Sequence, residues 1–309
     1  HYGGSRPLAL DIQPSFGVDA LLAPRRTVLD AHLVAAGRAA GAEVRHRTAL
    51  RRLTWDDASG RVTGAILRAP DGRDYGVSAR ITLGADGRRS SVARAVGAAT
   101  LKESVHRTGC VYGYFEGIPD DGYQWYYSTE AGAGAIPTNE ATHCVFAAVT
   151  DAEFRQARQT HSPAELLAML ARRANPEFGR QLDDARPVSR PVIFAGANGH
   201  IRQSFGPGWA LAGDAAYFKD PITAHGITDA LRDAEILANA VIGGTDRDLA
   251  EYQACRDVLS LDLFRITDRI ASFGWTLPEL QTLHRKLNET MKHEQGWMAE
   301  AFPREAAAA

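Results

Sequence analysis

The stretch that decides the fold is Gly206-Pro-Gly-Trp-Ala-Leu-Ala-Gly-Asp-Ala-Ala-Tyr-Phe-Lys-Asp-Pro-Ile-Thr-Ala-His-Gly-Ile-Thr-Asp-Ala-Leu-Arg-Asp-Ala234. It opens on the turn signal Gly-Pro-Gly, and the short apolar run at 209–212 is typical of one buried strand. Gly213-Asp214 ends that strand, and a long helical pattern begins near Gly226. A strand, an acidic turn, a loop and a helix in this order predict an α/β fold with a cofactor site at the carboxyl end of the strand.

The residues after the predicted strand have properties that suit a cofactor. Gly213 lets a ligand approach closely because it lacks a Cβ atom, and Asp214 is placed to accept hydrogen bonds from ligand hydroxyl groups. Pro221 holds its φ angle near about −65° and stiffens the loop. The helix opening, Ala224 to Thr228, presents unpaired N–H groups and the positive end of a helix dipole. Such an end suits a phosphate, or a ring that becomes anionic when it is reduced.

This stretch resembles the Gly-Asp motif of FAD-dependent oxidoreductases of the p-hydroxybenzoate hydroxylase and geranylgeranyl reductase superfamily. The resemblance is carried by Gly213-Asp214-Ala215-Ala216, Pro221, His225-Gly226 and Asp233-Ala234. It implies FAD as cofactor, with Asp214 at the ribityl chain, the Pro221 loop beside the isoalloxazine ring and the helix N-terminus at the pyrimidine edge. The cofactor-binding residues that it implies here are Gly213, Asp214, Pro221, Ala224, His225, Gly226 and Ile227. The sequence departs from the family pattern at Tyr217, at Ala224-His225-Gly226 and at Thr228.

A second stretch, Ile81 to Arg94, resembles the Asp-Gly motif of the same superfamily. A strand is expected to end before its glycine turn, and Ser90 or Ser91 can cap the helix that follows. The resemblance places Asp86 near the FAD pyrophosphate and implicates the region in NAD(P)H use; the alternative is a turn or N-cap aspartate. Arg26-Thr-Val-Leu29 fits the superfamily's Arg-x-x-Leu, whose arginine reaches the cofactor, although Arg26 could equally be a solvated first-turn residue.

The superfamily begins with a βαβ unit that carries Gly-x-Gly-x-x-Gly, and this motif is absent from the sequence. Gly132-Ala-Gly134 supplies two glycines, but Ile136-Pro137 follow where a helix with a third glycine would open. The unit needs roughly 30 residues or more, and too few precede Arg26. The sequence therefore predicts a chain that is truncated at its N-terminus and carries the later part of the superfamily's fold.

Composition restricts the class of protein. The chain of 309 residues is long enough for one large or two ordinary domains, and its 45% hydrophobic and 23% charged residues are typical of a soluble globular protein. A net charge of −2 argues against a nucleic-acid binder, and no apolar run reaches the ~18 residues of a membrane span. Cys110, Cys144 and Cys255 fit a reducing compartment, so we expect a cytoplasmic protein. The histidines show no metal-ligand spacing, and no metal site is predicted.

Periodicity along the chain predicts the domain organisation. Helical patterns cover 26–40, 154–182, the stretch up to about 242, and 248–287. Strands are expected at 43–53, 62–67 and 75–83, with a hairpin turn at Asp71-Gly72 between the last two, and within 105–149 and 186–194. We expect a three-layer FAD-binding domain, incomplete at its N-terminus, at 1–104 and 199–242. A mainly antiparallel substrate domain interrupts it at 105–198, and C-terminal helices follow at 243–309.

Several residues near the predicted site allow two interpretations. Tyr217 and His225 could contact flavin or substrate, or could serve packing and hydrogen bonding. Lys219 is expected to be solvated rather than functional. The aromatic run Trp125-Tyr126-Tyr127 could line a substrate pocket, although such runs in strands usually form core. No side chain is assigned a catalytic role.

The function that the resemblance implies is FAD-dependent monooxygenation of a small organic substrate. NAD(P)H would reduce the flavin, which would activate O₂, while the protein binds and orients the reactants. One alternative is a flavin-dependent reductase of carbon–carbon double bonds, like the geranylgeranyl reductases. Another is an inactive fragment that cannot hold FAD. A flavin halogenase fits less well, because the sequence lacks a Trp-x-Trp-x-Ile-Pro run.

Overall fold

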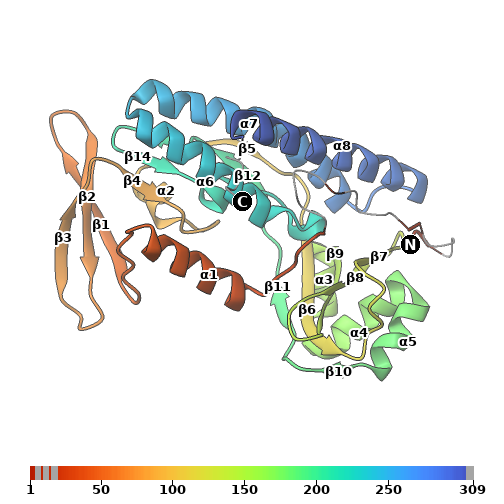
Figure 1. Ribbon diagram of the computed structural model, residues 1–309. Helices are drawn as coiled ribbons and strands as arrows, with labels where there is room; N and C mark the ends of the chain where they lie inside the picture. The colour runs from red at the N-terminus through yellow and green to blue at the C-terminus, as the bar shows by residue number, and fades with distance from the viewer. Residues whose placement is uncertain (4–7, 10–13, 15–19, 304–309) are drawn as a thin grey trace, which may run out of the picture. The chain divides into compact units, whose positions relative to one another are not determined.

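The computed structural model of the chain describes residues 1–3, 8–9, 14 and 20–303 (Figure 1). The chain folds into two units, each assembled from segments that are distant in the sequence. Unit 1 contains His1–Ala42, His106–Ala197 and Arg269–Ala309, and unit 2 contains Glu43–Val105 and Asn198–Asp268. Both sequence motifs therefore belong to unit 2.

An antiparallel sheet is the centre of unit 1, in the order β10-β6-β9-β8-β7, with β11 also paired to β6. Its strands are β6 (Thr108–Glu116), β7 (Gln124–Tyr127), β8 (Gly132–Pro137), β9 (His143–Thr150), β10 (Arg186–Pro187) and β11 (Val192–Phe194). Burial alternates along β6, because successive side chains of a strand point to opposite faces. Val111 and Phe115 lie in the core, whereas Cys110, Tyr112 and Tyr114 lie on the other face.

Three helices cover one face of this sheet (Figure 1): α3 (Asp151–Ala157), α4 (Pro163–Ala174) and α5 (Pro176–Asp184). The helical pattern expected at 154–182 is divided, because a proline begins α4 and α5 and cannot continue the preceding helix. Ser162 forms a capping box with Glu165, and Asn175 caps α5. The core side chains that these helices contribute include Phe154, Leu166, Leu167, Leu170, Phe178 and Leu182.

The other helices of unit 1 are α1 (Arg26–Ala39) and α8 (Leu277–Ala301). α8 begins at a capping box between Thr276 and Glu279. Tyr127 of β7 lies against His284 of α8, with ring centroids 4.7 Å apart. By contrast, α1 buries none of its residues.

Unit 2 contains three small sheets. Their strands are β1 (Ala49–Asp56), β2 (Arg61–Arg68) and β3 (Asp74–Ser78) in the first, β5 (Thr100–Glu103), β12 (His200–Arg202) and β15 (Tyr217–Phe218) in the second, and β4 (Thr82–Gly84), β13 (Phe205–Gly206) and β14 (Trp209–Leu211) in the third. β14 pairs with β4 in parallel, so that Trp209 lies beside Thr82 and Leu211 beside Gly84. The apolar run of the first motif is thus a buried strand, as its sequence predicts.

The helices of unit 2 are α2 (Ser91–Ala95), α6 (Gly226–Gly243) and α7 (Asp246–Ala271), whose end belongs to unit 1. Two short 3-10 turns, Gly213–Ala215 and Pro221–Thr223, lie between β14 and α6. α6 and α7 lie side by side (Figure 1), and the guanidinium of Arg232 donates to the Ser260 hydroxyl at 2.9 Å. α6 ends at Gly243, and the next residue, Gly244, takes a left-handed φ of 81° as the C-cap glycine.

The observed fold is mixed α/β, as the sequence predicts, with antiparallel strands throughout the sheet of unit 1. The units differ from the predicted domains in placing 1–42 and 269–309 together with 106–197. The assignment of cofactor and substrate to separate domains stays a prediction. Within the described residues, no helix combines the length and the apolar character that crossing a membrane requires.

Candidate functional site

The two sequence motifs follow the two parallel strands of unit 2. Because β4 and β14 run in the same direction, their carboxyl ends meet at one edge, where Ala212 donates its N–H to the Gly84 carbonyl at 3.0 Å. Asp86 lies just after β4, and Gly213-Asp214 lies just after β14. Ligands of open α/β sheets bind outside the carboxyl ends of the strands, so both motifs lie where such a ligand is expected.

Gly213 and Asp214 form the first 3-10 turn. Gly213 has a φ of 54°, and a Cβ atom there would lie 3.2 Å from the Ala230 side chain on α6, so glycine permits both the turn and the close approach of the helix. Asp214 is half-buried, and its Oδ1 lies 4.0 Å from the position that a Gly226 Cβ would occupy. The Asp214 carboxylate therefore lies beside the start of α6.

The loop between β15 and α6 turns at Pro221, which is exposed and begins the second 3-10 turn. Asp220 caps this turn by accepting the Ile222 N–H at 3.0 Å, and the Ile222 side chain is buried. Ala224 ends the turn with a left-handed φ of 51°. The loop is thus anchored by Asp220 and Ile222, while Pro221 and Ala224 are exposed on it.

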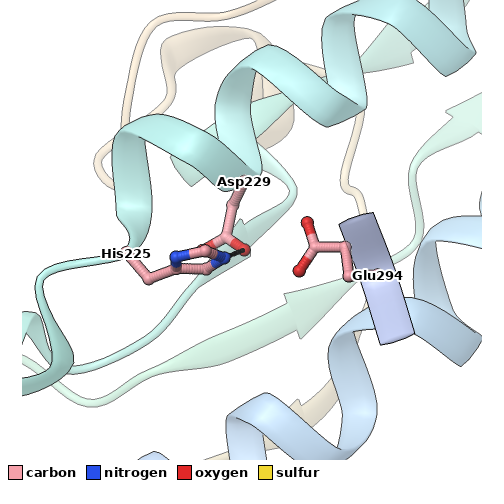
Figure 2. A group of neighbouring side chains, drawn as sticks. All are labelled: His225, Asp229 and Glu294. Atoms are coloured by element: carbon pink, nitrogen blue, oxygen red, sulfur yellow. Dashed lines mark ion pairs between the residues drawn. The ribbon is translucent and has the colours of Figure 1, made fainter. Parts of the chain in front are cut away.

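α6 begins at Gly226 with His225 as its N-cap residue, and the His225 side chain makes no capping hydrogen bond to the helix. Gly226, Ile227 and Thr228 are exposed. The first N–H groups of a helix have no acceptor within the helix, so this end can donate to an anion or to the polar edge of a ring. His225 Nε2 lies 3.8 Å from Asp229 Oδ1, one turn along α6 (Figure 2), a contact that is electrostatic rather than a hydrogen bond.

Ser90 is the N-cap residue of α2, and Asp86 lies in the turn before it and accepts hydrogen bonds from the start of the helix. Asp86 Oδ2 accepts the N–H groups of Ser91 at 2.6 Å and Val92 at 3.3 Å, and its Oδ1 accepts the Ser90 hydroxyl. Ser90 in turn accepts the Ala93 N–H at 2.9 Å. Ser90 is thus the cap that the sequence offered, and Asp86 fits the alternative of a turn aspartate. The place of Asp86 near a cofactor pyrophosphate stays a prediction.

Arg26 lies on α1 of unit 1, where 70% of its side chain is exposed. Its guanidinium forms an ion pair with Asp30 one turn later, at 2.7 Å. The other predicted cofactor-binding residues all belong to unit 2. The solvated interpretation of Arg26 agrees with this exposure, and its contact with the cofactor stays a prediction.

Two residues of β12, which the sequence did not single out, hold the Asp214 loop. His200 Nε2 lies 3.1 Å from the Asp214 carbonyl oxygen, and burial lowers the pKa of His200 to about 4, so a neutral imidazole donates this hydrogen bond. Arg202 donates to the carbonyl groups of Ala215 at 2.9 Å and Arg88 at 3.5 Å, and thereby joins the loops of the two motifs. Because β12 is only three residues long, its sequence has no periodicity from which the contacts of His200 and Arg202 could be predicted.

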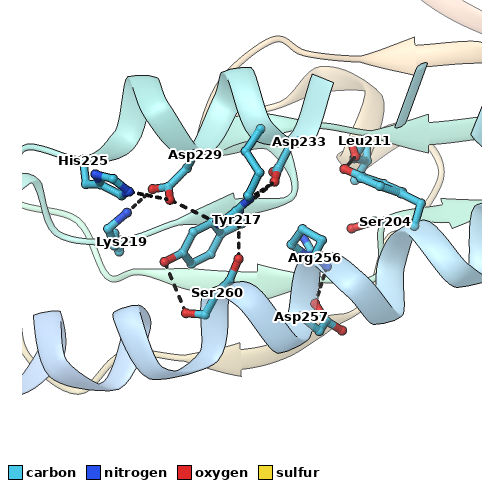
Figure 3. Close-up of polar contacts among 12 residues, drawn as sticks. Ser204, Leu211, Tyr217, Lys219, His225, Asp229, Asp233, Arg256, Asp257 and Ser260 are labelled. Carbon is cyan, nitrogen blue, oxygen red and sulfur yellow. Dashed lines mark hydrogen bonds and ion pairs between the residues drawn. The ribbon is translucent and has the colours of Figure 1, made fainter. Parts of the chain in front are cut away.

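Unit 2 also contains buried charges along the first turns of α6 (Figure 3). The expectation that Lys219 is solvated is wrong: this residue is 6% exposed, and its ammonium group forms an ion pair with Asp229. Arg232 lies 3.5 Å from Asp229 and donates to Asp233 at 2.7 Å. We call Lys219, Asp229, Arg232 and Asp233 the buried ion cluster. Burial raises the pKa of the Asp233 carboxyl, while Arg232 acts in the opposite direction.

Tyr217 packs beside this cluster (Figure 3). Its side chain is 2% exposed, its hydroxyl donates to the Ser260 carbonyl at 3.4 Å, and the Lys219 ammonium lies 5.0 Å from its ring centroid. The packing interpretation of Tyr217 therefore fits the structure. Also on α7, the fully buried Arg256 donates a hydrogen bond of 2.8 Å to the Arg202 carbonyl and thereby anchors β12 to this helix.

A second surface lies on the sheet face of unit 1 that α3, α4 and α5 leave uncovered. We call the partly exposed side chains Tyr112, Tyr114, Trp125 and Phe146 the aromatic face. Phe146 and Trp125 meet edge to face at 5.1 Å, and a Cβ at Gly134 would come within 2.6 Å of the Phe146 ring. Of the predicted aromatic run, Tyr126 lies in the core, so only part of that run faces outward.

Arg25 borders the aromatic face within unit 1. Its guanidinium carbon lies 4.5 Å from the centroid of the Tyr114 ring, in a cation–π contact. It donates to the Thr142 hydroxyl at 2.6 Å, and Glu140 lies 3.5 Å away. Burial raises the pKa of Tyr114. The aromatic face is therefore apolar, with a cation at its border.

The edge of β4 and β14 fits FAD, the cofactor that the motifs imply. FAD presents ribityl hydroxyl groups, a pyrophosphate and the pyrimidine edge of a ring, and the edge offers the Asp214 carboxylate as acceptor and helix amides as donors. Close approach to the backbone is possible at Gly87, which has a φ of 77° and no atom within 4 Å of a built Cβ, and at the exposed Gly226.

Comparison with known proteins agrees with this fit. A family described as FAD binding domain matches residues 6–257. The chain belongs to this family of FAD-binding domains. The resemblance to FAD-dependent oxidoreductases of the p-hydroxybenzoate hydroxylase and geranylgeranyl reductase superfamily is thereby confirmed.

The curated relatives of this FAD-binding domain include reductases. Digeranylgeranylglycerophospholipid reductase 2 of Methanopyrus kandleri is 27% identical over 289 residues, which cover 91% of this chain and 68% of the reductase. A match to the corresponding reductase of Methanothrix thermoacetophila, 29% identical, covers 71% of this chain and 55% of that protein. The chain thus spans between about half and two thirds of these relatives.

Solved flavoprotein structures share the fold. A triple mutant of the flavin-dependent brominase Bmp2 has a TM-score of 0.72 at 19% identity, covering 88% of this chain and 71% of that one. The ternary complex of aklavinone-11 hydroxylase with FAD and aklavinone has a TM-score of 0.59 at 22% identity, covering 78% and 46%. At such identities these likenesses establish the fold of the FAD-binding domain and leave the reaction open.

Proposed function

We propose that this FAD-binding domain is part of an NAD(P)H-dependent monooxygenase that oxygenates a small organic substrate. The observation that carries the proposal is the common edge of β4 and β14, where Asp214 and the start of α6 lie together. Bound FAD would take electrons from NAD(P)H and activate O₂. In such an enzyme the flavin carries the redox chemistry, and the protein's residues bind and orient the cofactor and the substrate. The lack of an assigned catalytic side chain is consistent with this class.

Each part of the edge has a role in this proposal. The Asp214 carboxylate would accept hydrogen bonds from the ribityl hydroxyl groups of bound FAD. His200 and Arg202 hold the loop that carries Asp214. The N–H groups at Gly226 and Ile227, at the start of α6, would donate to the pyrimidine edge of bound FAD and stabilise negative charge there. Asp86 orders the start of α2, and the open turn at Gly87 would let the pyrophosphate of bound FAD approach the backbone.

The aromatic face of unit 1 is our proposed substrate surface. Partly exposed Tyr112 and Phe146 offer flat apolar contacts, which suit a planar aromatic or conjugated substrate. Arg25 at its border suits a substrate that also carries a negative charge or a hydrogen-bond acceptor. Aklavinone is bound by the hydroxylase named above, and that complex does not identify the substrate of this chain.

A second candidate is a flavin-dependent reductase of carbon–carbon double bonds, favoured by the 27% identity to a digeranylgeranylglycerophospholipid reductase. Both reactions would oxidise NAD(P)H in the presence of substrate. They differ in the product, which gains one oxygen atom from a monooxygenase and two hydrogen atoms from a reductase. Mass spectrometry of the product and measurement of O₂ consumption therefore separate the two.

The first experiment is a visible spectrum of the purified chain before and after addition of FAD and desalting. Retained flavin, followed by NADH and NADPH oxidation assays, would support the proposal. Asp214→Ala is expected to lose the flavin, while Asp57→Ala, at an exposed position of unit 2, retains it. A wild-type chain that stays colourless after FAD addition would contradict the proposal and favour an inactive fragment.

A further inference from the structure

Lys219 and Asp229 mark the two ends of the loop that carries Pro221. Lys219 directly follows β15, and Asp229 lies in the first turn of α6. The two side chains are each 3% exposed and form an ion pair, which is drawn in Figure 3. The pair therefore joins the loop's entry to the helix that follows it.

Stability alone is a weak reason for such a pair. Removing two ions from water costs several kcal/mol each, as an order of magnitude, and their attraction often only offsets this cost. Apolar side chains of similar volume would hold the loop as well or better. A role that depends on the charges of Lys219 and Asp229 accounts better for their burial.

The charge of Asp229 has a direct consequence for the end of α6. A helix N-terminus carries the equivalent of about half a positive charge, and a carboxylate in the first turn opposes it. Lys219 pairs with this carboxylate, while Arg232 lies farther away at 3.5 Å and is closer to Asp233, at 2.7 Å. Lys219 therefore reduces the negative charge that Asp229 places beside the exposed amides of Gly226 and Ile227.

We propose that Lys219 is an electrostatic positioning residue of the flavin site, which neutralises Asp229 and keeps the start of α6 attractive to negative charge on the cofactor. Lys219 acts through the helix and does not touch the cofactor. The inference rests on the proposed function, because it concerns the same site.

The test compares Lys219→Met, Asp229→Asn and the double variant Lys219→Met/Asp229→Leu with wild type. Three quantities are measured: the reduction potential of bound flavin, the Kd for FAD and the free energy of unfolding of the chain without FAD. In Lys219→Met the Asp229 carboxylate loses its nearest cation and keeps only the more distant Arg232, so we expect a more negative potential and FAD binding weakened on the order of threefold to tenfold. Asp229→Asn should shift the potential in the positive direction. The double variant, whose pair is apolar and neutral, should return the potential toward the wild-type value.

A purely structural pair predicts a different pattern. Both single variants would then lose stability and shift the potential in the same direction, and such a result would overturn the proposal. An unchanged potential in Lys219→Met would overturn it as well. Lys102→Met, at an exposed position of β5 in unit 2, is the matched control and should match wild type in all three quantities. A wild-type chain that binds no FAD would refute the proposed function itself, and this inference with it.

Discussion

The guanidinium of Arg202 donates a hydrogen bond of 2.9 Å to the main-chain carbonyl of Ala215. The same side chain reaches the Arg88 carbonyl, at 3.4 and 3.5 Å. One half-buried residue of β12 thus connects the loop after β14 with the loop after β4, and its own carbonyl is held by Arg256. Arg202 thus adds a side-chain connection between the two motifs to the pairing of β4 with β14.

Replacement of Arg202 should therefore weaken FAD binding and stability together. In Arg202→Met the carbonyl groups of Ala215 and Arg88 lose their donor, which costs about 1–3 kcal/mol of unfolding free energy. We expect FAD affinity to fall roughly tenfold because the two loops are no longer held together. Urea unfolding and FAD titration check this. Arg265→Met, whose side chain is 63% exposed, is the control, and equal behaviour of the two variants would refute the role of Arg202.

The buried His200 predicts a pH dependence of stability. Its folded pKa of about 4 lies below the ordinary value of 6.5, so in this window the unfolded chain binds a proton that the folded chain does not. The stabilisation is complete above about pH 6.5 and is lost as the pH falls to about 4, by up to roughly 3 kcal/mol.

The measurement is the free energy of unfolding between pH 7 and 4, roughly, for wild type and His200→Gln. Glutamine retains a donor for the Asp214 carbonyl and does not titrate, so the variant should show a shallower pH dependence. His284 of unit 1, whose pKa is also lowered to about 4 by burial, contributes to both proteins and cancels in the difference. Parallel curves for the two proteins would show that His200 does not titrate in this range.

Gly208, in the turn between β13 and β14, should not tolerate a side chain. Its φ is 76°, and a Cβ atom would lie 2.1 Å from the Val62 carbonyl oxygen of β2. Gly72 also has a positive φ, 86°, but no atom lies within 4 Å of a built Cβ there. Gly72→Ala should cost about 1 kcal/mol from backbone strain alone, and Gly208→Ala more than about 2 kcal/mol. If the two variants lose similar unfolding free energy in urea, β2 can move away from the added Cβ atom at little cost, and the prediction for Gly208 is wrong.

The proposed substrate surface can be tested without knowledge of the reaction type. Once a substrate is found, Phe146→Leu should raise KM and lower kcat/KM about tenfold, while the Kd for FAD stays unchanged. Val258→Ala, at a position of α7 that is 76% exposed, is a control for loss of apolar surface. If Phe146→Leu has wild-type KM, the aromatic face is not the substrate surface.

The sequence by itself determined the fold class, the family and the kind of cofactor. These follow from local features: a short apolar run that must be buried, glycines where backbone approach is close, and a helix start at a fixed distance after an acidic turn. The strand at Trp209, the turn at Asp214 and the helix from Gly226 are all present in the structure where the spacing predicts them. Local spacing is sufficient here because each feature depends on neighbours within a few residues.

Only the tertiary structure decided which distant groups meet. Lys219 reads as a solvated lysine in the sequence, because nothing near it shows that Asp229 will fold back onto it and that both will be buried. His200 and Arg202 gain their roles from the pairing of β12 with β15 and β5, and Arg202 contacts Arg88, which is 114 residues away. The Arg202 contact depends on chain folding over a long separation, and the Lys219–Asp229 pair depends on how the loop between them turns back, ten residues along the chain. An ion pair or a buried donor leaves no periodic signal in the sequence that would reveal its partner.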